Sequence, residues 1–263
     1  MSKVAPIKER KYGWLPDVPS AKDYPFRSLR AIPRLNPPSA NLSSFVPYVH
    51  DQSNLGSCAP QSITEQLELL RVKNKVPRPA CSPMFEYYNT RVLQDTVNFD
   101  SGCYIRTTIK AAAQFGICSE VSWPYIIPKF TIKPPISAYT EAEDNQILQY
   151  FRLTTGSLAE MKTCLADGYA FSFGFSVYDY FQSAKMAQTG ILYLPRPKEK
   201  LLGGHAVLAV GYNEKQRRFL ILNSWGKGWG LPKMPGFFTM PYEYITNPDY
   251  ADDFWTIRTA ENA

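Results

Sequence analysis

Histidine is scarce in this chain, which has only His50 and His205 among its 263 residues. Any chemistry that needs an imidazole therefore has two candidates. Cysteine occurs five times, and the odd number leaves at least one thiol free or paired between chains. No two cysteines follow the Cys-x-x-Cys spacing, so a structural zinc site of the usual kind is not expected. We expect neither a metal nor an organic cofactor.

Long apolar runs are also missing. No stretch of about 18 uninterrupted apolar residues occurs, so we expect no membrane-spanning helix. The first residues lack the apolar core of a secretory signal, which leaves a cytoplasmic location or export by another route. Of the net charge of +6, residues 1–40 carry +5 and residues 41–263 only +1. A nearly neutral body does not indicate a nucleic-acid-binding surface, so we expect no nucleic-acid partner.

The periodicity of the chain predicts helices first and strands later, which favours an α+β architecture in two lobes. Residues 1–40 form a basic, proline-rich arm, 41–135 a mainly helical lobe, and 136–263 a mainly β lobe. Predicted helices begin near Ser57, Ser82 and Ser157, and another lies over 105–115 before Gly116. The predicted strands are 169–177, 206–212, 219–223, 236–240 and 254–258.

Cys58 is the first candidate for chemistry. It stands at the predicted start of a helix, where unpaired N–H groups and the helix dipole favour a thiolate over a thiol. Gln52, six residues earlier, can offer its side-chain amide to an oxyanion beside the sulfur. The alternative is a small buried cysteine in a core helix.

His205 and Asn223 are two further candidates. Gly203-Gly204 precede His205 at the entry to a predicted strand, and two glycines let a ligand approach the backbone closely. Asn223 leaves the next strand in the string Asn-Ser-Trp-Gly-Lys-Gly-Trp-Gly, where it can accept a hydrogen bond from the imidazole and fix its tautomer. Trp225 would cover that bond. Taken singly, the alternatives are a histidine at a turn and a glycine-rich turn with core tryptophans.

Together these segments supply a thiol nucleophile, a base, an orienting group and an oxyanion donor, namely Cys58, His205, Asn223 and Gln52. In order and surroundings they resemble the papain-like cysteine peptidases, most of all their compact bacterial members, over about residues 41–258. The Asn-Ser-Trp string is the most specific match, and the 147 residues between the thiol and the imidazole fit the papain interval. Leu55 departs from the family, which usually has a cysteine there, and this leaves Cys103 without its disulfide partner.

The resemblance implies a papain-like α+β fold with the active site in a cleft between a helical lobe and a β-barrel-like lobe. It implies an endopeptidase that acts on peptides or proteins through a Cys58 thiolate, a His205 imidazolium and an acyl-enzyme intermediate. An extended substrate would run antiparallel to the backbone near two glycines, and an apolar side chain would enter a pocket near it. The substrate-binding residues expected on this basis are Gly102, Tyr104, Gly204, Trp225, Phe173 and Met240.

Three other interpretations remain open at this stage. His50 is a second possible base, but it shares a segment with Gln52 and has no asparagine partner of the same kind. A non-proteolytic acyl-transfer enzyme, similar to a transglutaminase or a deamidase, could use the same cysteine. A binding module without catalysis is the third possibility, and the intact set of four chemical groups disfavours it.

The N-terminal arm has a possible role of its own. Papain-like peptidases commonly carry a prosegment that blocks the cleft, and about 40 residues are too few for the usual helical inhibitory domain. The prolines and Trp14 suit an extended strap that lies over the cleft. A packed or frayed tail is the alternative. If the strap occludes the cleft, removal of residues 1–40 should raise peptidase activity.

Overall fold

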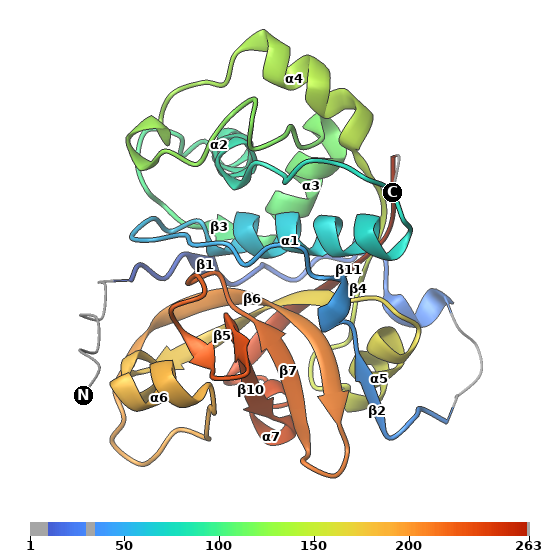
Figure 1. Ribbon diagram of the computed structural model, residues 1–263, viewed down its shortest axis with the longest axis vertical. Coiled ribbons are helices and arrows are strands. Elements are labelled where there is room, and N and C mark those ends of the chain that lie inside the picture. The colour runs from blue at the N-terminus through green and yellow to red at the C-terminus, as the bar shows by residue number, and fades with distance from the viewer. Residues whose placement is uncertain (1–9, 30–34, 262–263) are drawn as a thin grey trace.

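The computed structural model describes residues 10–29 and 35–261 of the chain. Figure 1 shows helices α1 to α4 gathered at one end of the molecule and most of the sheet at the other. Each end has its own hydrophobic core, one built mainly around helices and one around strands. The expected α+β architecture is therefore confirmed. Within the described ranges, no helix is long and apolar enough to cross a membrane.

The helical end is organised around α1 (Cys58–Lys73), which lies between the sheet and the helices α2 to α4 (Figure 1). All its residues from Cys58 to Arg71 are buried, because both lobes cover it. Helix α2 (Pro83–Leu93) begins where Ser82 accepts a hydrogen bond from the Phe85 amide. Helix α3 (Ile105–Phe115) ends at Gly116, whose φ of 70° suits glycine. These three helices lie where the sequence predicted them, and α4 (Ile136–Ala142) was not predicted.

The other end is a seven-stranded antiparallel sheet with the order β10-β7-β6-β5-β11-β4, and β2 also pairs with β6. Strand β6 is the longest and extends well beyond the predicted segment. Strand β4 was not predicted, and the other long strands overlap their predicted ranges. The bounds are β2 (Ser39–Asn41), β4 (Ile147–Arg152), β5 (Phe171–Tyr178), β6 (Leu201–Asn213), β7 (Arg218–Leu222), β10 (Phe237–Pro241) and β11 (Ala251–Ala260).

Short elements connect these parts, and some late segments return to the helical end. Ala138, Ala142 and Ile147, together with Trp255 from β11, pack in the core that the helices form. The two cores therefore interlock through the last strands. The remaining elements are η1 (Phe26–Leu29), η2 (Ser43–Phe45), η3 (Ile127–Lys129), η4 (Glu143–Asn145), α5 (Leu158–Ala166), η5 (Asp179–Gln182), α6 (Ala184–Thr189), β8 (Gly230–Leu231), β9 (Met234–Pro235) and α7 (Tyr242–Ile245).

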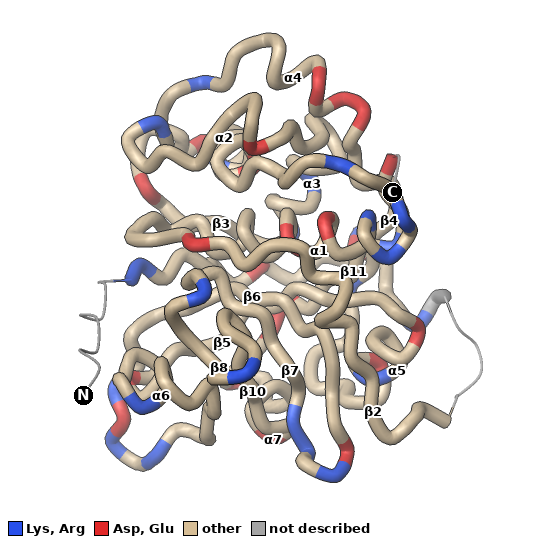
Figure 2. Tube along the Cα trace, viewed as in Figure 1, with Lys and Arg blue, Asp and Glu red and all other residues tan. Residues whose placement is uncertain are grey.

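The described part of the N-terminal arm crosses the molecule between α1 and β6 (Figure 1). Within it, β1 (Trp14–Leu15) pairs in parallel with β3 (Cys103–Tyr104), and the Cys103 amide donates to the Gly13 carbonyl at 2.7 Å. Figure 2 shows basic and acidic residues mixed over both lobes, in agreement with the nearly neutral body of the sequence. The arm therefore contributes a strand to the region where the two lobes meet.

Candidate active site

Cys58 is the first residue of α1 and has no exposed surface. Burial raises the pKa of its thiol to about 11, because the interior disfavours the thiolate. Backbone amides of Ala206, in β6, and Gly13, in the arm, lower it by a smaller amount. The thiol therefore lies near both the β lobe and the arm.

His205 is next to Ala206 in β6, so the strand whose amide lowers the pKa of the thiol also carries the imidazole. Its Nε2 lies 2.8 Å from Asn223 Oδ1, and the side-chain oxygen of an asparagine can only accept. Nε2 therefore carries the hydrogen, and Nδ1 presents its lone pair. Among the described residues, this buried Nδ1 has no hydrogen-bond partner. The imidazole is thus oriented by one nitrogen and left able to take a proton on the other.

Aromatic rings and the arm close the space around His205. The ring centroid of Trp225 lies 5.2 Å from that of the imidazole, and that of Tyr12 lies 6.1 Å away. Complete burial lowers the pKa of His205 to about 4, although the hydrogen bond to Asn223 opposes this shift. The charge of Arg10, also in the arm, lowers the pKa further. With the arm in place, the neutral thiol and the neutral imidazole are therefore the favoured forms.

Gln52 lies at the junction of the two lobes and is fully buried. Its Oε1 accepts from Ser224 Oγ at 2.8 Å, and its backbone amide donates to the Ser224 carbonyl at 2.9 Å. Its Nε2 donates to the carbonyls of Leu55 at 2.9 Å and Lys11 at 3.2 Å. The β lobe thus fixes the side-chain amide of Gln52, and a carbonyl oxygen of the arm accepts one of the two N–H groups of that amide.

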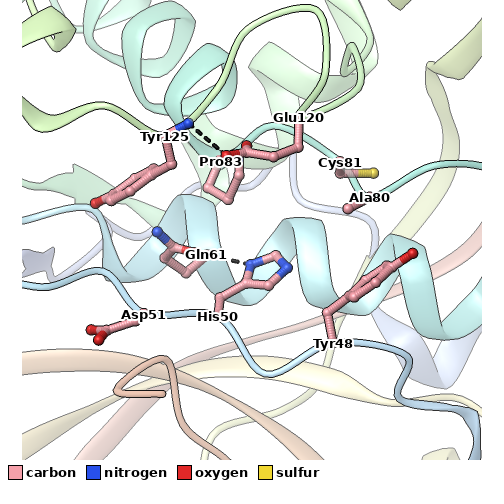
Figure 3. Close-up of a pocket in the computed structure, with 9 residues that line it drawn as sticks. All are labelled: Tyr48, His50, Asp51, Gln61, Ala80, Cys81, Pro83, Glu120 and Tyr125. Carbon is pink, nitrogen blue, oxygen red and sulfur yellow. Dashed lines mark hydrogen bonds between the residues drawn. The ribbon is translucent and has the colours of Figure 1, made fainter. Parts of the chain in front are cut away.

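His50, the alternative base, is committed to other partners. Its Nδ1 lies 2.9 Å from Gln61 Oε1 and its Nε2 lies 3.1 Å from Glu68 Oε2. Figure 3 shows the ring beside Gln61 in a pocket of the helical lobe. Burial alone would lower its pKa, but the charges of Glu68 and Glu65 outweigh burial and raise it to about 9. A protonated imidazole with both nitrogens engaged cannot serve as a general base, which argues against that alternative.

The raised pKa of His50 predicts a pH-dependent stability. Folding favours the protonated form of His50. This stabilises the protein fully below the ordinary pKa near 6.5, and the stabilisation is lost as the pH rises through about 9. We expect this group to lower the free energy of unfolding by about 3 kcal/mol over that interval. Urea unfolding at several pH values should show the fall, and His50→Gln, which keeps a donor near Gln61, should remove most of it. An equal fall in both proteins would contradict the assignment.

Four of the expected substrate-binding residues lie along the arm. A Cβ added at Gly102 would come within 2.4 Å of the Gly13 carbonyl, and one at Gly204 within 2.6 Å of the Trp14 ring. Tyr104 pairs with Leu15 through β3, and the Arg10 side chain donates to the Trp225 carbonyl at 3.2 Å. Gly102 and Gly204 therefore allow the backbone of the arm and the Trp14 indole to approach closely.

Phe173 and Met240 lie elsewhere, and this corrects the expected apolar pocket. Both are fully buried in the core of the β lobe, where the Phe173 ring stacks on Phe254. The residue that faces the arm is Gly174, whose added Cβ would fall 1.9 Å from the Trp14 ring. Side chains alternate across a strand, so a shift of one residue exchanges the core face for the other face.

Acidic residues around the arm were missed by the sequence argument. Asp253, in β11, is fully buried and accepts hydrogen bonds from the Trp14 indole at 2.9 Å and the Asp17 amide at 2.7 Å. Asp100 forms an ion pair with Lys11, with Nζ 2.6 Å from Oδ2, and Asp51 forms one with Arg10, with Nη1 2.7 Å from Oδ1. One signal was present in the sequence: Asp253 follows another aspartate inside a run of strand-forming residues.

A two-lobed α+β fold that sets a helix-terminal cysteine against a histidine–asparagine pair is typical of thiol-dependent hydrolases. Residues 39–247 match the family model for the papain family of cysteine proteases. The chain therefore belongs to the papain family, and it is a cysteine peptidase with the papain-like fold. The family, fold and enzyme class that the sequence predicted are confirmed.

Relatives support the same conclusion. An uncharacterised peptidase C1-like protein of Acanthamoeba polyphaga mimivirus is 39% identical over 79% of this chain and 68% of its own length. A cathepsin L-like proteinase of Fasciola hepatica is 28% identical over 72% of this chain and 55% of its own length. The crystal structure of xylellain, a cysteine protease from Xylella fastidiosa, matches with a TM-score of 0.86 and 36% identity, covering 96% of this chain and 97% of that one.

Proposed function

We propose that the chain is an endopeptidase that cleaves peptide bonds through Cys58, His205, Asn223 and Gln52. The observation that carries this proposal is the 2.8 Å hydrogen bond from His205 Nε2 to Asn223, which leaves Nδ1 unpartnered among the described residues, on the strand whose Ala206 amide lowers the pKa of the Cys58 thiol. His205 takes the thiol proton at Nδ1, and the sulfur attacks the carbonyl carbon of the substrate. The imidazolium then gives that proton to the leaving amine, and an acyl-enzyme thioester remains.

The second half of the reaction uses the same groups. His205 takes a proton from water, the resulting hydroxide attacks the thioester carbonyl, and the thiol is released with the acid product. In both halves, the oxyanion would accept from the Cys58 backbone amide and Gln52 Nε2. Gln52 suits this role because Ser224 fixes its oxygen at 2.8 Å, which orients the nitrogen before a substrate arrives.

The arm gives these groups a resting state. Lys11 places its carbonyl on the Gln52 amide, and the segment that begins at Gly13 follows β3 in parallel. A substrate is expected to run antiparallel there, so the arm fills the cleft in the reverse direction, which disfavours attack on its own bonds. The same cover removes water from Cys58 and His205 and favours their neutral forms. The expected thiolate–imidazolium pair is therefore assigned to the state in which the arm has left the cleft.

Active-site labelling tests this proposed function. Incubation with an epoxysuccinyl peptide should modify Cys58 in a one-to-one ratio, and cleavage of dipeptide substrates should disappear in step with labelling. Mass spectrometry of peptides from the labelled chain locates the modified thiol among the five, all of which are free and buried. Labelling of another cysteine with the same loss of activity would overturn the proposed role of Cys58.

A further inference from the structure

Arg10, in the arm, is held by a set of groups at the edge of the cleft. Its Nη1 lies 2.7 Å from Asp51 Oδ1, and its Nη2 donates to the Trp225 carbonyl at 3.2 Å. A weaker bond of 3.4 Å joins Nη1 to the Ser53 carbonyl, and the guanidinium carbon lies 5.3 Å from the centroid of the Trp225 ring. Only 10% of the arginine side chain is exposed. A carboxylate, two carbonyls and an aromatic ring together suit a planar, multivalent cation.

These groups are positioned by the protein body and not by the arm. The Ser53 amide donates to Asp51 Oδ1 at 2.9 Å, and the Gly226 amide donates to the His50 carbonyl at 2.8 Å. Asp51 and Trp225 also form an isolated antiparallel bridge between the lobes. The site for the cation would therefore remain after the arm has left, because its geometry rests on contacts between the two lobes.

The path of the arm shows on which side of a scissile bond the groups that bind Arg10 lie. The Lys11 carbonyl accepts from Gln52 Nε2, so it marks the place of the reacting carbonyl. From Gly13 onward the arm follows β3, along which the acyl part of a substrate is expected to lie. Arg10 lies on the other side of Lys11 and therefore where the leaving-group part of a substrate would pass. The Lys11 side chain itself is bound separately, by Asp100 at 2.6 Å.

We infer that Asp51 and Trp225 form a subsite that selects arginine at one of the two positions following the scissile bond. This inference rests on the proposed function and specifies its substrate class: peptides with a basic residue on the leaving-group side. Arginine fits better than lysine, because a guanidinium can bond the carboxylate and the Trp225 carbonyl together while it lies over the indole. Glutamate in the same position would meet the Asp51 carboxylate and be rejected.

The test compares quenched fluorescent peptides that differ only in having arginine, lysine, glutamine or glutamate at the first or second position after the bond. The full chain is used, because the arm covers the cleft equally whichever peptide is added, and ratios of kcat/KM are then independent of occlusion. At one of the two positions we expect arginine to exceed glutamine by roughly 5- to 20-fold, with lysine between them and glutamate lowest. The preference should weaken with added salt.

Asp51→Asn keeps the acceptor for the Ser53 amide and removes the charge. It should bring the ratio of arginine to glutamine peptides below about twofold, while the loss of an arm contact raises the rates of all peptides together. Asp100→Asn is the matched control, because it removes a carboxylate that binds the arm at Lys11, and it should leave that ratio unchanged. In Asp51→Asn, the kcat/KM values for the glutamine and glutamate peptides should also become nearly equal.

The outcomes separate this inference from the proposed function. Cleavage with equal kcat/KM for arginine and glutamine peptides at both positions overturns the subsite and leaves the peptidase intact. A preference for arginine that survives in Asp51→Asn, or that disappears in Asp100→Asn, removes the assignment to Asp51. Absence of cleavage of every peptide, with no labelling of Cys58, rejects the proposed function and this inference with it.

Discussion

Replacing Cys58 with alanine should abolish peptide hydrolysis, with a fall in kcat/KM of at least about 10⁴-fold. The proposed reaction has no other atom that can form the thioester, and the imidazole alone cannot replace covalent catalysis. The fold should persist, because removal of one buried sulfur costs only about 1 kcal/mol. Initial rates with a fluorogenic dipeptide substrate measure the loss, and thermal unfolding followed by circular dichroism checks that the chain is folded.

Cys164→Ala is the matched control for that experiment. Its thiol is also fully buried, and burial raises its pKa to about 11, as for Cys58. Cys164 lies in α5, however, and bonds Thr256 at 3.3 Å. The control should therefore keep its activity. Turnover that survives in Cys58→Ala, or an equal loss in both variants, would contradict the proposed nucleophile.

Replacing Trp14 with alanine should raise kcat/KM for small substrates by about tenfold to a hundredfold. The indole fills the space above Gly174 and Gly204, and its N–H bonds the buried Asp253 at 2.9 Å. Its loss removes apolar burial worth about 1.5–3 kcal/mol and leaves the carboxylate without one of its donors. The arm then leaves the cleft in a larger fraction of molecules, and substrates gain access to the same thiol.

The pH dependence of Cys58 alkylation gives a second readout of the arm. Thiolate is the reactive form, and burial raises the pKa of the thiol to about 11, so the wild-type chain should react slowly at neutral pH. In Trp14→Ala the rise in rate should begin at a lower pH, because water reaches the sulfur and the imidazole and favours their charged forms. Val18→Ala is the control, since this arm side chain is 72% exposed. Identical alkylation profiles in all three proteins would show that the arm does not control the thiol.

Local sequence was sufficient for the elements whose signals lie within a few residues. Ser82 followed by proline predicted the start of α2, and Gly116 predicted the end of α3, because capping depends on neighbouring backbone groups. Strand β4 and helix α4 carried no such signals. Strand β4 is defined by pairing with β11, more than a hundred residues later, and only the folded chain brings the two together.

The candidate site divides in the same way. The four proposed chemical groups were recognisable because the family motif preserves residue types around them. The sequence did not show which face of each strand points into the core. Phe173 was therefore expected in the substrate pocket, although Gly174 faces the arm. A pattern of alternation gives two equivalent faces, and only the packing of β5 against its neighbours decides which one is core.

The sequence by itself determined the family, the helix-then-strand order and the residues able to supply a thiol, an imidazole and an amide. These follow from residue types and short spacings. The tertiary structure decided the direction of the arm, the complete burial of Cys58 and His205, and the position of Asp51 beside Trp225. Each of these depends on burial or on contacts between distant segments, whose free energies exist only once the two lobes and the arm are packed together.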